Sequence, residues 1–183
     1  MRFELGTFSS GGAAFPAIVV DGRAARLADV LDGAPAQSTL ALLDHWNEVA
    51  PRLHAFADAP SAGIEWIDVD ALVVHAPIQP RQVFCAGANY RKHVVDLAID
   101  SGVAPDGLDT DGRRAWAEEM MDRRAREGEP YVFTKPVSSI AGPHDPIAVP
   151  PTTAKLDWEL ELAVVIGRTC HRVSRADAMD VVA

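Results

Sequence analysis

The sequence predicts a protein of mixed helices and strands in two regions, residues 1–76 and residues 77–183. Two observations carry this prediction: an apolar stripe with helical spacing between Ser38 and Phe56, and a strict alternation of apolar and acidic residues from Leu156 to Leu162. The 183 residues are enough to bury a hydrophobic core without a disulfide or a structural metal.

Composition narrows the classes of protein to consider. The formal net charge is −9, and nucleic-acid binding needs clustered Lys and Arg, so no nucleic-acid partner is expected. No apolar run approaches the ~20 residues that span a bilayer, and the N-terminus lacks the layout of a signal peptide. We therefore expect no membrane association and a cytoplasmic location. The two cysteines, Cys85 and Cys170, form no pattern and are predicted to be free thiols.

Three elements are expected in residues 1–76. The apolar run Ala17–Val20 stops at the turn signal Asp21-Gly22, which predicts a strand. A short helix is predicted at Leu27–Leu31 and a longer one from about Ser38 to Phe56. No group of side chains in this region indicates chemistry.

The second region begins after Pro77, with a buried strand at Gln82–Ala86 and a helix at Tyr90–Ile99. Residues 101–129 then carry glycines, a proline and a strongly charged helical stretch, Arg113–Arg126, with a thin apolar edge. This insertion is either a lid or a solvated helix without function.

The chain beyond residue 130 is predicted to be dominated by strands. They are expected at Tyr131–Thr134, Ile147–Val149 and Leu156–Ile166, and Ser174 is expected to cap a final helix through Val181. The sequence then stops at apolar residues within the helical pattern, whereas chain ends are usually polar and frayed. We therefore expect a truncated domain.

The alternating segment predicts a strand with two different faces. Its four large apolar residues, Leu156, Trp158, Leu160 and Leu162, would face the core. Asp157, Glu159 and Glu161 would line the opposite face about 6.5 Å apart. Three adjacent carboxylates repel unless they are solvated or share a cation, and Mg²⁺ or Mn²⁺ takes oxygen ligands of this kind. The alternative is a half-exposed strand with a wet acidic face.

Two further candidates for catalysis lie between these segments. On a helix, His93 and Asp96 share a face one turn apart, so the carboxylate can orient the imidazole as a general base. Pro136 restricts Lys135 to an extended backbone, from which the ammonium could hold a substrate carboxylate or an oxyanion. The alternatives are an ordinary surface helix pair and a solvated lysine in a turn.

Three segments taken in order resemble the fumarylacetoacetate hydrolase family: Ala86–His93, Phe133–Pro136 with the serines that follow, and Asp157–Gly167. The resemblance covers the chain from about Pro80 to its end. It implies a β-rich α+β catalytic domain, incomplete at residues 77–183 and preceded by a small N-terminal α/β region at residues 1–76. It also implies a homodimer.

The resemblance further implies a site. Mg²⁺ or a similar ion would be held by Glu159, Glu161 and one more acidic residue, expected on a segment beyond Ala183. His93 and Asp96 would form a water-activating dyad, although the family more often uses Glu than the shorter Asp.

The function expected from this resemblance is metal-dependent hydrolysis of a carbon–carbon bond in a 2,4-dioxo acid of the acylpyruvate or fumarylacetoacetate type. The alternatives are a related decarboxylase, isomerase or hydratase of 2-oxo acids, or a non-catalytic fragment that associates with another chain. If the polypeptide ends at Ala183, we expect no catalysis and only weak Mg²⁺ binding from it alone.

Overall fold

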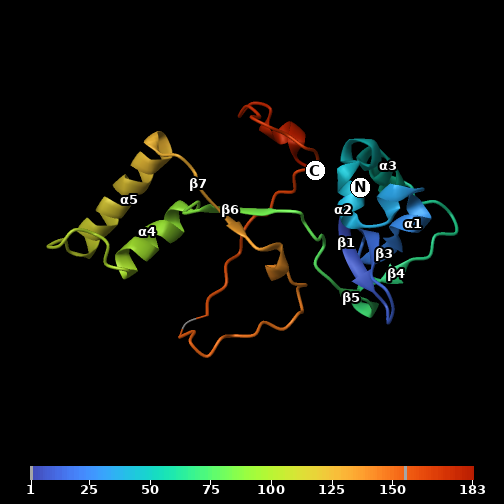
Figure 1. Cartoon of the computed structure of the whole chain (residues 1–183), viewed down its shortest axis with the longest axis horizontal. Coiled ribbons are helices and arrows are strands. Elements are labelled where there is room, and N and C mark those ends of the chain that lie inside the picture. Colours follow the sequence, from blue (N-terminus) through green and yellow to red (C-terminus); the bar gives the residue numbers. More distant parts are fainter. Residues whose placement is uncertain (1, 155) are drawn as a thin grey trace. The chain divides into compact units, whose positions relative to one another are not determined.

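A computed structural model describes residues 2–154 and 156–183 (Figure 1). These residues group into two units by their contacts. The sheet unit contains the chain up to Pro80 together with Ile140–Ala183, and the hairpin unit contains Arg81–Ser139. In the described part of the chain, no helix is long and apolar enough to cross a bilayer.

The sheet unit is built on antiparallel strands. Among the described residues, five strands pair in the order β4-β3-β2-β1-β5. Their bounds are β1 Glu4–Ser9, β2 Phe15–Val20, β3 Arg23–Arg26, β4 Ile67–Asp68 and β5 Val73–Val74. The predicted turn joins β2 to β3, with φ of 50° at Asp21 and 74° at Gly22. Positive φ at both central residues is characteristic of a type I′ turn, whose twist matches that of the two strands it joins.

Short helices cover one face of this sheet. They are α1 Leu27–Val30, α2 Thr39–Asp44 and α3 Trp46–Asp58. Ile18, Leu42 and Leu53 are fully buried in their shared core. The single helix predicted from Ser38 to Phe56 is therefore two helices, which break at His45, where φ is −113° and ψ is 23°. Ser38 caps the first of them by accepting a hydrogen bond from the amide of Ala41 at 3.0 Å.

The opposite face of the sheet carries a second cluster. It is formed by Phe8, Phe15, Ala17, Val19, Ala24 and Leu72. The guanidinium of Arg26 lies 3.5 Å from the ring centroid of Phe15 and so covers part of this face. Both faces of β2 are thus buried, which agrees with its continuous apolar sequence.

The hairpin unit consists of a pair of strands and a pair of helices. Its elements are β6 Val83–Gly87, α4 Arg91–Asp100, α5 Thr110–Glu127 and β7 Tyr131–Lys135. In the described residues β6 pairs only with β7, in antiparallel register from Val83 opposite Lys135 to Gly87 opposite Tyr131. The helices pack on each other through a small core of Val95, Ala98, Ala117 and Met121. The predictions of β6, α4, α5 and β7 are confirmed within a few residues at each end.

The strand predictions at Ile147–Val149 and Leu156–Ile166 are wrong. In the described residues neither segment forms a row of backbone hydrogen bonds with a neighbouring strand. The second segment forms one isolated bridge, between Ile166 and Val182. Trp158 is 81% exposed and Leu160 is 87% exposed, although both were expected in the core. Alternation gives a strand only where a neighbouring strand takes up the backbone hydrogen bonds. Here that pairing begins only at Val165, whose carbonyl accepts from the amide of Ala183.

The final helix is also shorter than predicted. Residues Ala178–Val181 form a 3₁₀ turn rather than an α-helix through residues 174–181. The hydroxyl of Ser174 bonds the Asp177 carboxylate at 2.6 Å and accepts from the Asp177 amide at 3.2 Å. The bond from the Asp177 amide has the same spacing as the N-cap contact at Ser38, but the residues after Asp177 continue only as a 3₁₀ turn.

Candidate functional site

The site begins at the tight connection between β6 and α4. Ala88 has a φ of 54°, a left-handed backbone conformation that residues other than glycine rarely adopt. A Cβ at the preceding Gly87 would clash with Cδ1 of Tyr131 on the paired strand. The Gly-Ala pair therefore allows close contact with β7 and an abrupt turn into the helix. Backbone strain of this kind often marks a functional position.

His93 and Asp96 both lie on α4, as predicted. His93 is exposed in the first turn, and Asp96 is partly buried one turn later. The Asp96 carboxylate accepts a hydrogen bond from the guanidinium of Arg114, on α5, at 3.4 Å. The insertion thus contributes a cation to the carboxylate that was expected to orient His93.

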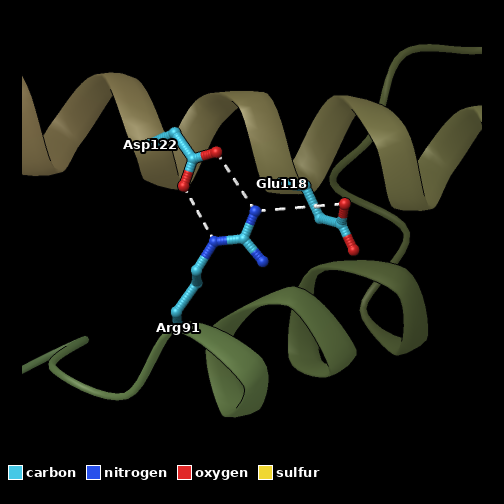
Figure 2. Close-up of polar contacts among 3 residues, drawn as sticks. All are labelled: Arg91, Glu118 and Asp122. Atoms are coloured by element: carbon cyan, nitrogen blue, oxygen red, sulfur yellow. Dashed lines mark hydrogen bonds and ion pairs between the residues drawn. The ribbon is translucent and has the colours of Figure 1, made fainter.

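A second ion pair joins the same two helices (Figure 2). The guanidinium of Arg91 donates two hydrogen bonds to Asp122, at 2.8 and 3.1 Å, and lies 3.9 Å from the Glu118 carboxylate. The hydrogen bonds from Arg91 lower the pKa of the Asp122 carboxyl, and the same contact raises the pKa of Arg91. Bidentate pairing of this kind fixes the orientation of both side chains.

Lys135 is the last residue of β7, directly before Pro136. It pairs with Val83, at the end of the ladder opposite to Gly87 and the entry into α4. The four residues between Val83 and Gly87 span roughly 13 Å of strand. Within the hairpin unit, Lys135 is therefore placed at the far end of the sheet from the start of the helix that carries His93.

Glu159 and Glu161 belong to the sheet unit, in the exposed segment without a ladder. Their carboxylates are the hard oxygen donors that Mg²⁺ prefers. Among the described residues, however, no group of three or more His, Cys, Asp or Glu side chains is placed to hold a metal ion. The described residues thus do not form a complete metal site, and the roles of both glutamates remain predictions.

The ion pairs between α4 and α5 were missed in the sequence. A usable signal was present, because Arg114, Glu118 and Asp122 are spaced by four residues and so follow one face of a helix. On α4, the cation Arg91 also precedes the anion Asp96, so each charge lies opposite its counterpart when the two helices run antiparallel. Recognising the match required knowing that the two helices pack antiparallel.

Comparison with known proteins identifies relatives of this chain. The family profile described as fumarylacetoacetate (FAA) hydrolase C-terminal matches residues 82–183. Protein Rv2993c of Mycobacterium tuberculosis is 31% identical over 127 residues, which are 69% of this chain and 38% of that protein. The human mitochondrial oxaloacetate tautomerase FAHD2B is 49% identical over 117 residues, which are 63% of this chain and 28% of that protein. The chain thus spans well under half the length of these curated relatives.

A solved structure agrees with this placement at the level of fold. The crystal structure of maleylpyruvate hydrolase from Sphingobium sp. SYK-6 matches with a TM-score of 0.57 at 20% identity, over 99% of this chain and 55% of that one. Since the family profile covers more than half of the sequence, and covers the strand, helix and acidic segment described above, the chain belongs to the fumarylacetoacetate hydrolase family.

Proposed function

We propose that the protein acts on a 2-oxo acid and hydrolyses a carbon–carbon bond in a 2,4-dioxo acid, with His93 as general base. The observation that carries the proposal is the placement of His93, exposed in the first turn of α4 directly after the strained connection at Ala88. Histidine is the side chain used most often as a general base in enzymes. The substrate class rests on family membership and on the names of the tautomerase and the hydrolase among the similar proteins.

The chemistry assigned to His93 is proton transfer. The imidazole takes a proton from water, and the resulting hydroxide adds to the carbonyl carbon distal to the 2-oxo acid group. The bond from that carbon to the neighbouring methylene breaks, leaving a carboxylic acid and the enolate of a 2-oxo acid. The enolate carbon takes up a proton, which balances the one removed from water. General-base assistance of this kind contributes about 10²- to 10⁴-fold in rate.

Divalent metal ions are common in enzymes of this family, and such an ion supplies Lewis-acid stabilisation of an enolate when bound. Glu159 and Glu161 are the carboxylates proposed to contribute to holding Mg²⁺ or Mn²⁺. Contact of Lys135 with a substrate anion and assembly as a homodimer are likewise proposals.

A second candidate is tautomerisation of a 2-oxo acid. It is favoured by the human relative, which is named an oxaloacetate tautomerase and is 49% identical over 117 residues. His93 would then move a proton between the methylene carbon and the solvent, and no carbon–carbon bond would break.

Product analysis separates the two candidates. The protein in its full natural length would be incubated with an acylpyruvate and, separately, with the enol of oxaloacetate. Hydrolysis predicts equal amounts of pyruvate and a carboxylic acid from the acylpyruvate. Faster enol–keto conversion of oxaloacetate, with the acylpyruvate left intact, would support the tautomerase instead. Absence of both reactions would contradict the proposed function.

A further inference from the structure

We infer that α5 is a positioning element for α4, and that the ion pairs Arg91–Asp122 and Asp96–Arg114 set the way in which α4 presents His93. The inference assigns a role to the insertion at residues 101–129, which the sequence left open between a lid and a solvated helix. The expected effect of α5 on turnover rests on the proposed function. The expected effect of α5 on the position of α4 does not depend on it.

The first argument is the order of charges along the two helices. From its N-terminus, α4 carries a cation at Arg91 and then an anion at Asp96. From its own N-terminus, α5 carries a cation at Arg114 and then an anion at Asp122. In the antiparallel arrangement, Arg91 meets Asp122 at 2.8 Å and Asp96 meets Arg114 at 3.4 Å. A parallel arrangement would set cation against cation and anion against anion, so the charges favour one orientation.

The second argument is that the fully buried part of the apolar seam specifies the register weakly. Its four buried residues are Val95, Ala98, Ala117 and Met121, and four partly buried apolar side chains pack against them: Val94, Ile99, Trp116 and Met120. Two of the four buried residues are alanines, whose single methyl groups form only shallow ridges, and the methionines can adapt to irregular gaps. The seam can therefore bring the helices together, while the charged pairs select among similar registers, as paired charges do at helical interfaces generally.

The third argument is the location of the pairs relative to His93. Arg91 lies two residues before His93 and Asp96 three residues after it, so the helix is held to α5 on both sides of the imidazole. Arg91 is held by two hydrogen bonds to Asp122 and lies near Glu118 (Figure 2). Exposed single ion pairs contribute little to stability, but bidentate geometry within a network is the exception. The bidentate pair of Arg91 with Asp122 and the single contact of Asp96 with Arg114 hold α4 at two points, which limits both its rotation and its sliding.

The inference can be tested on the ring of His93. In the 183-residue chain, the His93 ring signal is identified in a ¹H–¹³C NMR spectrum by its loss in His93→Gln, since only six histidines are present. Asp122→Arg places a second cation beside Arg91, and we expect the His93 signal to shift and broaden. The double variant Arg91→Asp with Asp122→Arg restores the pair in reverse and should restore the signal.

Glu119→Arg is the matched control. It makes the same change of charge on α5, one turn away, at an exposed residue. A His93 signal that is equally perturbed by Asp122→Arg and Glu119→Arg, or is unchanged by both, would overturn the inference. Failure of the double variant to restore the signal would overturn it as well.

Turnover distinguishes this inference from the proposed function. In the protein of full natural length, Asp122→Arg should lower kcat about tenfold or more, with KM changed much less, because a displaced base weakens the chemical step more than binding. The double variant should recover most of kcat, and an unaltered kcat in Asp122→Arg would contradict the role of α5. If His93→Ala leaves turnover intact, the proposed function is wrong, and the NMR comparison still decides whether α5 positions α4.

Discussion

Replacing Val95 by alanine tests the packing that holds α4 in place. Val95 is 2% exposed and lies at the centre of the seam with α5, two residues from His93. The change deletes two carbon atoms, which at ~0.8 kcal/mol for each buried group is about 1.6 kcal/mol. The void left behind adds to this loss, because the neighbours relax only partly. We therefore expect a loss of about 2 kcal/mol in the free energy of opening the hairpin.

Hydrogen exchange measures this free energy directly at the amides of α4. A loss of about 2 kcal/mol corresponds to roughly 25-fold faster exchange, since 1.4 kcal/mol is a factor of ten. Leu97→Ala is the control, because it deletes more carbon atoms from a side chain that is 50% exposed on the same helix. Its effect should stay within about 0.5 kcal/mol. Equal acceleration in the two variants, or a larger effect in Leu97→Ala, would refute the seam as described.

Two other perturbations have defined outcomes. The pKa of Asp122 is lowered from 3.8 by its hydrogen bonds with Arg91, so the pair stabilises the hairpin fully above pH 3.8 and loses this contribution as the pH falls through the folded value. In acid titrations followed by hydrogen exchange, Arg91→Gln should remove this part of the pH dependence, and an unchanged profile would count against the pair. Ile18→Ala deletes three carbons from a fully buried residue of β2 and should destabilise the sheet unit by about 2–5 kcal/mol in urea unfolding. Val73→Ala, at a residue that is 58% exposed, should change the same free energy by less than about 0.5 kcal/mol, and similar values for both would show that the core is wrongly identified.

Elements with local signals were predictable from the sequence. The turn at Asp21-Gly22 requires positive φ at both residues, and the structure has it. The strand β6, the helix α4 and the strand β7 follow from short apolar runs bounded by Gly, Asn or Pro. The positions of His93 and Asp96 on one helix, and of Lys135 at a strand end, depend only on these local patterns, so the sequence was sufficient to place them.

Features that depend on a partner in space were not predictable. Leu156–Leu162 has the strongest alternation in the chain, yet in the described residues no neighbouring strand takes up its hydrogen bonds, and Trp158 is exposed. The break at His45 interrupts an apolar stripe that continues through both helices, so the periodicity of apolar residues did not predict the break. The contact between Asp96 and Arg114 joins residues 18 positions apart, and depends on the antiparallel packing of two helices.

Steady-state turnover of His93→Ala tests the proposed general base most directly. The measurement would use the protein of full natural length with an acylpyruvate or oxaloacetate, and Lys92→Ala, at the neighbouring exposed residue of α4, would serve as control. Loss of the base predicts that kcat falls by about 10²- to 10⁴-fold in His93→Ala and changes less than about twofold in Lys92→Ala. A His93→Ala protein that keeps the kcat of the unaltered protein would contradict the assignment of His93 as the base.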